Sequence, residues 1–261
     1  MHRFFAPDCG ASGGLVTLSP DEGAHLTRVL RLRPGDRVVL VDGRGGSWTA
    51  TIDAVHPDVR ARIHESIAPA PEPRVRVTLA SAVLKGEGFD QVVRDAVMLG
   101  VSAIQPVIST RTVRTHGAAG APAPTTDDLS HTGAVRGRRA DRWTRIAIAS
   151  MKQCGRAVLP EVATPTDLPT LLAAARQGAR LMLVEPQAGG ADRVPLAALD
   201  ARPVPGAATL LVGPEGGWTT EEVAAARAAG WTLLTLGGRT LRAEAAPLVA
   251  LAGLWTVWKE F

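Results

Sequence analysis

Two glycine-bearing loops near the end of the chain have the composition of a ligand-binding site. Residues 210–212 are apolar, as in a buried strand, and the loop Gly-Pro-Glu-Gly-Gly follows at 213–217. A second apolar strand at 233–236 is followed by the loop Gly-Gly-Arg at 237–239. Glycine permits backbone angles and close approaches of a ligand that other residues exclude. Because each loop leads from a strand into a predicted helix, the repeated plan predicts a binding site formed by both loops.

The residues around the first loop restrict what it binds. A phosphate-binding P-loop places Lys and then Ser or Thr after its last glycine, whereas Trp218 stands there and Glu215 puts a carboxylate inside the loop. No strand leads into Gly-x-Gly-x-x-Gly, so a nucleotide held in the usual Rossmann manner is also disfavoured. A nucleoside-like ligand without phosphates fits better. The simpler alternative is that the glycines only form turns and that Glu215 is a solvated charge.

The helix that follows this loop has recognisable ends. Thr219 and Glu222 have the spacing of a capping box, and Gly230 suits the left-handed position just past a helix. The helix after the second loop carries its apolar residues at 248, 251, 254 and 255. The sequence therefore predicts two strand-loop-helix units in succession.

The segments GPEGG at 213–217 and LGGRTLRAEAA at 236–246 resemble, in spacing and in order, the signature of the RsmE family of ribosomal RNA methyltransferases. Lys85-Gly86 and residues 153–156 extend the resemblance over nearly the whole chain. The family belongs to the SPOUT superfamily. The resemblance implies that C-terminal loops of a trefoil knot bind S-adenosylmethionine (SAM). It also implies a homodimer that methylates the N3 atom of a uridine in 16S ribosomal RNA, within the small ribosomal subunit or as free RNA.

The resemblance further implies roles for single residues. Arg242 would stabilise the oxyanion that forms on uracil as the N3 proton leaves, and Glu215 or Glu244 would act as the base. Arg242 and Glu244 have an alternative use, since charges commonly cap or pair at the start of a helix. The residues expected to bind the cofactor are Glu185, Leu211, Val212, Gly213, Glu215, Gly216, Gly217, Leu236, Gly237 and Leu241.

The chain departs from the family pattern at two pairs of positions. Asp95 and Met98 stand where relatives carry lysine and glutamate, which argues against catalytic roles in that predicted helix. Ala243 and Ala245 stand where relatives carry threonines. Alanine keeps the side chain small at both positions. The two replacements therefore exclude a role for the threonine hydroxyls, but they do not argue against the activity.

The composition indicates a folded cytoplasmic enzyme. The 261 residues with 46% hydrophobic residues can bury a substantial core. The first residues lack the apolar run of a signal peptide, and no apolar segment has membrane-spanning length. Cys9 and Cys154 are too few for a disulfide framework or a zinc site, so both are expected to be free thiols, and no metal site is expected.

The charge distribution suggests where RNA binds. The formal net charge is +4, and residues 136–156 hold seven basic residues and a single acidic one. Such density is a candidate nucleic-acid footprint, although a solvated helix face has the same composition. Arg156 is the RNA-binding candidate of this region, within a segment that resembles the family's Gln-Ser-x-Arg with cysteine in place of serine. Further candidates for phosphate contacts are Arg28, Arg31 and Arg33 in a string that resembles a PUA-like RNA-binding domain.

The predicted fold class is α/β with two domains. Residues 1–70 are expected to form a PUA-like β-barrel that contains an edge strand at 3–5 and a hairpin at 36–52, and three prolines at 69–73 mark a linker. Alternating strands and helices at 74–261 predict a mainly parallel sheet, the SPOUT methyltransferase domain. Residues 115–140 are poor in large apolar side chains and are expected to be a flexible insertion.

Two other functions are compatible with parts of the sequence. A non-catalytic RNA-binding ribosome-assembly factor would keep the basic segment and the PUA-like domain, but it would not need an intact cofactor loop. A Rossmann-type enzyme would also alternate strands and helices, but residues 84–88 lack the glycine spacing that its first strand requires.

Overall fold

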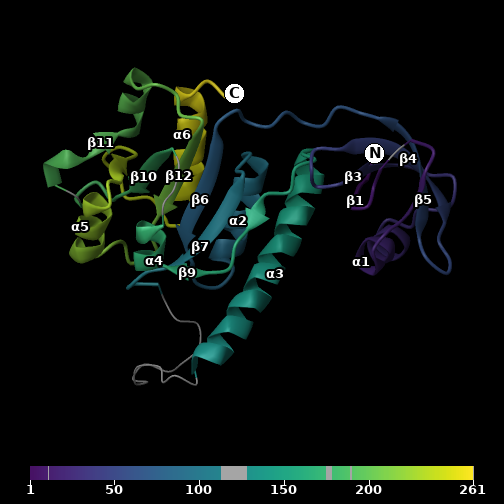
Figure 1. Cartoon of the computed structure of the whole chain (residues 1–261), viewed down its shortest axis with the longest axis horizontal. Helices are drawn as coiled ribbons and strands as arrows, with labels where there is room; N and C mark the ends of the chain where they lie inside the picture. The colour runs from purple at the N-terminus through teal and green to yellow at the C-terminus, as the bar shows by residue number, and fades with distance from the viewer. Residues whose placement is uncertain (11, 113–127, 175–177, 189, 261) are drawn as a thin grey trace. The chain divides into compact units, whose positions relative to one another are not determined.

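The computed structural model describes residues 1–10, 12–112, 128–174, 178–188 and 190–260. The chain forms two compact units. Unit 1 comprises Met1–Glu72 and Ile148–Leu159, and unit 2 comprises Pro73–Ala147 and Pro160–Phe261. Figure 1 follows the chain through both units. Unit 1 thus includes a second segment, 148–159, that the sequence assigned to the C-terminal domain.

Unit 1 is built on a five-stranded sheet with strand order β1-β3-β4-β5-β2. The edge strand expected at residues 3–5 is present as β1 and pairs in parallel with β3, and the other pairs are antiparallel. The predicted hairpin is β3 with β4. The elements are β1 (Arg3–Phe5), β2 (Leu15–Thr17), α1 (Pro20–Ala24), the π-helix η1 (His25–Val29), β3 (Arg37–Val41), β4 (Ser47–Ala54) and β5 (Arg60–Ser66).

The segment 148–159 completes unit 1 through backbone and charged contacts. The Gly45 amide donates to the Ala157 carbonyl at 3.0 Å, and the Leu159 amide donates to the Gly43 carbonyl at 2.9 Å. Lys152 Nζ lies 2.5 Å from a carboxylate oxygen of Glu22, which is only 9% exposed. A carboxylate that is this buried requires a compensating charge. The segment therefore neutralises charge inside unit 1 as well as extending its backbone pairing.

The Cys9 thiol is expected to be unreactive in the folded protein. Burial, and secondarily the Asp42 carboxylate, raise its pKa from 9.0 to about 11. The thiolate is the reactive form, so its fraction at pH 8 falls roughly 100-fold. In a Cys154→Ser variant, iodoacetamide should modify Cys9 rapidly only after denaturation, as mass spectrometry would show. The raised pKa stabilises the fold below pH 9, and this contribution is lost between pH 9 and 11. Rapid modification of the folded variant at pH 8 would contradict this assignment.

Unit 2 is an α/β unit around an eight-stranded sheet with the order β11-β13-β10-β12-β6-β7-β8, and β9 pairs with β7. All of these pairs are parallel, as the alternating pattern predicted. The elements are β6 (Arg76–Ala82), α2 (Gly88–Met98), β7 (Ala103–Ile108), α3 (Asp128–Cys154, of which the residues from Ile148 onward belong to unit 1), β8 (Glu161–Val162), β9 (Thr166–Asp167), α4 (Leu168–Ala173), β10 (Ala179–Leu183), η2 (Gly190–Asp192), β11 (Val194–Pro195), η3 (Leu196–Ala201), β12 (Ala207–Val212), α5 (Thr220–Ala228), β13 (Thr232–Thr235) and α6 (Ala246–Val257).

Buried side chains fasten helices α2 and α3 to each other. Asp90 is 4% exposed and accepts hydrogen bonds from the Trp143 indole nitrogen at 3.1 Å and from the Arg142 guanidinium. The rings of Phe89 and Trp143 lie 4.4 Å apart between centroids. Trp255 and Trp258 of the C-terminal region are also buried, at 1% and 3% exposure. They therefore contribute to the core rather than to an exposed face of unit 2.

The second half of the expected flexible insertion is helical. Residues 128–140 belong to α3, whereas residues 113–127 lie outside the described residues. A shortage of large apolar residues excludes a core element but not a helix, and the flexibility expected of this segment stays a prediction. The intrinsic helix propensity of its arginines and alanines favours the helical conformation. The trefoil knot depends on the path of the backbone rather than on strand order, and it stays a prediction.

Among the described residues, none of the helices combines the length and the apolar character needed to span a bilayer.

Candidate active site

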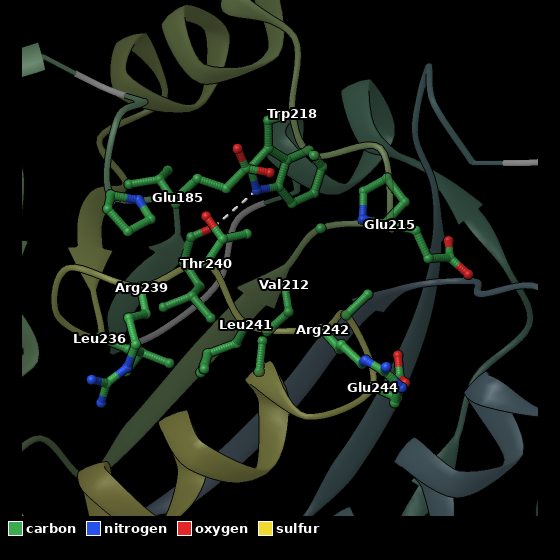
Figure 2. A pocket seen from close by; sticks show the side chains of 18 residues that line it. Glu185, Val212, Glu215, Trp218, Leu236, Arg239, Thr240, Leu241, Arg242 and Glu244 are labelled. Atoms are coloured by element: carbon green, nitrogen blue, oxygen red, sulfur yellow. Dashed lines mark hydrogen bonds between the residues drawn. The ribbon is translucent and has the colours of Figure 1, made fainter.

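A pocket of about 420 Å³ lies at the carboxyl ends of three neighbouring parallel strands (Figure 2). This is where open parallel sheets commonly bind ligands. Its walls come from the last residues of β10 and β12, from the segments that follow β10, β12 and β13, and from the first residue of α6. The lining residues are Leu183, Val184, Glu185, Pro186, Val212, Gly213, Pro214, Glu215, Gly217, Trp218, Leu236, Arg239, Thr240, Leu241, Arg242, Ala243, Glu244 and Ala246.

Close packing explains why two positions of the first loop are glycine. Gly217 has a φ of +67°, and a Cβ atom there would lie 2.2 Å from Oε1 of Glu185. A Cβ atom on Gly213 would lie 2.9 Å from the indole ring of Trp218. That indole donates a hydrogen bond from Nε1 to the Leu183 carbonyl at 2.9 Å, drawn as a dashed line in Figure 2. The glycines thus let Glu185 and Trp218 lie directly against the loop.

The capping box predicted from Thr219 and Glu222 begins helix α5. Glu222 donates its backbone N–H to the Thr219 hydroxyl at 3.2 Å, and its carboxylate accepts from the Thr219 N–H at 2.9 Å. Gly230 follows the helix with a φ of +77°, as expected for its left-handed end. The start of α5 fixes where the first glycine loop ends. The spacing of Thr219 and Glu222 in the sequence therefore also sets the position of the pocket wall that this loop forms.

The second loop carries charged side chains into the pocket without capping the helix behind it. In the described chain, no side chain caps α6 at Ala245, so capping by Arg242 or Glu244 is not what these residues do. Instead, the Arg242 carbonyl accepts from the amides of Ala245 and Ala246, both at 3.0 Å. Figure 2 shows Arg242 and Glu244 on one side of the pocket and Arg239 on the other.

The carboxylate of Glu215 is engaged in a structural contact. Its Oε1 accepts a hydrogen bond from the backbone N–H of Lys85 at 2.9 Å. Lys85 follows strand β6, so this bond ties the first glycine loop to the neighbouring strand's loop. No comparable hydrogen bond involves the Glu244 carboxylate within the described residues.

The structure brings together most of the residues predicted from the sequence. All three catalytic candidates line the pocket. So do the cofactor candidates Glu185, Val212, Gly213, Glu215, Gly217, Leu236 and Leu241.

Three cofactor candidates do not line the pocket. Leu211 is fully buried and packs into the core with Met182 and Trp218, because neighbouring residues of a strand face opposite sides. Gly216 packs against the side chain of Arg111. Gly237 is exposed and has a φ of +109°. The turn at this position requires a backbone angle that favours glycine, and this explains the residue without a cofactor contact.

The sequence reasoning missed several lining residues, among them Trp218, Arg239, Thr240 and Ala246. Trp218 served only to exclude a P-loop, and nothing in the sequence shows that its ring would turn back over Gly213. Arg239 and Thr240 stand between predicted site residues, and this spacing was the only signal that could have identified them.

The arginines predicted to bind RNA fall into two environments. Arg28, Arg31 and Arg33 are exposed around and after η1 in unit 1, and Arg31 has a φ of 54°. Arg156 is only 4% exposed, and its Nε donates to both carboxylate oxygens of Glu72, at 2.9 and 3.1 Å. A buried guanidinium paired with a carboxylate is not available to a phosphate. The structure therefore contradicts the interpretation of Arg156 as an RNA contact.

The fold and the pocket agree with two family models. Residues 71–255 match the model described as an RNA methyltransferase domain, and residues 18–58 match the RNA methyltransferase PUA domain. These matches define the class as RNA methyltransferases with an N-terminal PUA-like domain and a SPOUT-type α/β domain. Within that class, the chain belongs to the RsmE family.

Individual relatives agree with this assignment. The ribosomal RNA small subunit methyltransferase E of Synechocystis sp. is 34% identical over 244 residues, which cover 91% of this chain and 71% of the relative. The Neisseria gonorrhoeae protein of that name, solved bound to S-adenosyl methionine, is 31% identical. Its TM-score is 0.81, with 99% of this chain and 98% of that chain covered. A Legionella pneumophila protein solved with bound SAM has a TM-score of 0.83 at 29% identity, covering 97% of this chain and 96% of that one.

Proposed function

We propose that this protein transfers the methyl group of SAM to the N3 atom of a uridine in 16S ribosomal RNA of the small subunit. The observation that carries the proposal is the pocket at the two predicted glycine loops. It occurs in a chain whose family includes small subunit methyltransferase E proteins and structures with bound SAM. A purely RNA-binding assembly factor would have no need for such a pocket.

The pocket residues fit a cofactor that combines a nucleoside with a charged amino acid. The volume of about 420 Å³ lies within the range of small-molecule sites. Val212, Leu236 and Leu241 offer apolar contacts to a base, and Glu185 offers a carboxylate to hydroxyl or ammonium groups. The remaining residues of the proposed cofactor site are Leu211, Gly213, Glu215, Gly216, Gly217 and Gly237. Of these, Leu211, Gly216 and Gly237 would act by shaping the loops. When bound, SAM supplies a methyl group already activated on a sulfonium.

Two side chains are assigned to the uracil. Loss of the N3 proton places negative charge on the neighbouring oxygens O2 and O4, and the Arg242 guanidinium would stabilise that charge. Glu244 would accept the proton, because no hydrogen bond within the described residues occupies its carboxylate. Glu215 instead would hold the loop through the Lys85 amide. The protein mainly has to keep N3 in line with the methyl group at near-contact distance.

Exchanging each carboxylate for an amide separates these roles. Glu244→Gln should lower kcat for methyl transfer by about 100-fold, since the amide cannot accept the N3 proton. Glu215→Gln keeps an oxygen that can accept from the Lys85 amide, so its kcat should stay within about threefold of wild type. Single-turnover methylation with radiolabelled SAM would measure both variants. A large loss of kcat in Glu215→Gln, together with an active Glu244→Gln, would identify Glu215 rather than Glu244 as the base.

RNA recognition is assigned to the residues predicted for the N-terminal domain, 1–70. The exposed guanidiniums of Arg28, Arg31 and Arg33 would contact phosphates, which position an RNA without reading its sequence. Residues 74–261 would form the methyltransferase domain. We also propose a homodimer, as the SPOUT resemblance implies, and a cytoplasmic location, where ribosomal subunits are assembled.

Two linked measurements test the proposed function. Calorimetric titration of the purified protein with SAM should show saturable binding. Incubation with radiolabelled SAM and either small subunits or deproteinised 16S RNA should label the RNA, and nucleoside digestion should yield N3-methyluridine. A folded wild-type protein that neither binds SAM nor labels either substrate would overturn the proposal. Labelling of another nucleoside would retain the class of enzyme and reject the N3 assignment.

A further inference from the structure

The segment that follows β7 forms hydrogen bonds with the first glycine loop on the side away from the pocket. Arg111 donates from Nη1 to the carbonyl of Gly216 at 2.7 Å and to the carbonyl of Trp218 at 3.3 Å. Its aliphatic part packs on Gly216, where an added Cβ atom would lie 3.2 Å from Cβ of Arg111. A single guanidinium thus bonds to the main chain on both sides of Gly217.

A second bond holds the same segment to the end of the loop. The backbone N–H of Thr110 donates to the Glu222 carboxylate at 2.8 Å, and Glu222 is 8% exposed. Glu222 is the carboxylate of the capping box that begins α5. The position of Arg111 is therefore set by the start of the helix that the loop leads into.

These contacts restrain a part of the chain that is otherwise free to rotate. Gly216 and Gly217 are adjacent glycines, which have the largest range of backbone conformations. The peptide between them is held on both sides, because its carbonyl accepts from Arg111 and its N–H donates to the Pro214 carbonyl at 3.0 Å. Arg111 and Gly216 do not line the pocket, whereas Gly217 and Trp218 do. The guanidinium of Arg111 thus contacts the main chain of the pocket wall from the side that faces away from the pocket.

We propose that Arg111 is a positioning residue that keeps the Gly216–Gly217 peptide in the conformation that binds the cofactor. It does not touch the cofactor. Without it, the loop would populate other conformations, and the apparent affinity would fall in proportion to the competent fraction. The inference rests on the proposed function, because it takes SAM as the ligand of this pocket.

The first test compares two arginine variants by calorimetric titration with SAM. Arg111→Met should raise the Kd about tenfold, which corresponds to a competent fraction near one tenth. Arg94→Met is the matched control, since Arg94 is an exposed arginine on α2 whose guanidinium bonds to Gln91 at 3.2 Å. Its Kd should equal that of wild type. An unchanged Kd in Arg111→Met, beside a wild type that binds SAM, would overturn the inference and leave the proposed function intact.

Chemical rescue distinguishes positioning from a general loss of stability. In Arg111→Ala, millimolar guanidinium ion should restore SAM affinity by filling the vacated space and bonding to the two carbonyls. The same ion should leave the Kd of wild type and of Arg94→Met unchanged. Weak binding that guanidinium does not restore, together with a lowered melting temperature, would reject the positioning role. A wild type that fails to bind SAM would remove the proposed function and this inference together.

Discussion

Arg242→Met should lower kcat for methyl transfer by about 1,000-fold, or ~4 kcal/mol in activation free energy, while SAM affinity changes by less than twofold. The guanidinium lines the pocket on the same side as Glu244. In this assignment it meets charge that develops only as the uracil N3 proton leaves. An interaction formed only in the transition state changes kcat rather than ground-state binding. Single-turnover kinetics at saturating SAM and RNA would measure the effect.

Arg239→Met is the matched control for Arg242→Met. Both arginines line the pocket, but Figure 2 shows Arg239 on the side away from Glu244. A general loss of positive charge would affect both variants alike, whereas a specific oxyanion contact would make Arg242→Met much slower. Equal rates in the two variants would contradict the role given to Arg242.

Gly217→Val should weaken SAM binding by at least about 100-fold, which corresponds to ~2.7 kcal/mol. The φ of +67° is strained for a β-branched residue, and the added Cβ atom would meet Oε1 of Glu185 at 2.2 Å. Glu185 could avoid the contact only by moving its carboxylate, which is itself a proposed cofactor contact. The substitution therefore disturbs both the loop conformation and the proposed contact between Glu185 and the cofactor. Calorimetric titration, with circular dichroism to confirm folding, would measure the loss.

Gly206→Val provides the comparison for Gly217→Val. Gly206 precedes β12, is exposed, has no positive φ, and an added Cβ atom there would meet nothing within 4 Å. This variant should bind SAM as wild type does. A folded Gly217→Val protein with unimpaired SAM affinity would place the cofactor elsewhere.

Local patterns predicted the local structure well. The edge strand expected at 3–5 is β1 with the same bounds, and the capping box of Thr219 and Glu222 begins α5 as expected. Such signals depend on residues within a few positions of each other, where periodicity and capping chemistry act. The positions of the two glycine loops followed from the same kind of reasoning, and both contribute to the pocket.

Contacts between distant parts of the chain were not predictable. Arg156 pairs with Glu72 across 84 positions, and Glu215 bonds to the Lys85 amide across 130. Composition alone cannot distinguish a buried ion pair from an exposed phosphate contact, because both use the same side chains. For this reason Arg156 was misassigned, and the structural use of the Glu215 carboxylate stayed hidden.

The two-part composition of unit 1 has a consequence for synthesis on the ribosome. Among the described residues, Glu22 and Glu72 form ion pairs with Lys152 and Arg156, which lie within the segment 148–159. While residues 73–147 are still being made, the first 72 residues carry these two carboxylates without their cations. The N-terminal unit therefore reaches its final form only after more than half of the polypeptide has emerged. The maturation of this unit therefore depends on chain that is synthesised after residue 147.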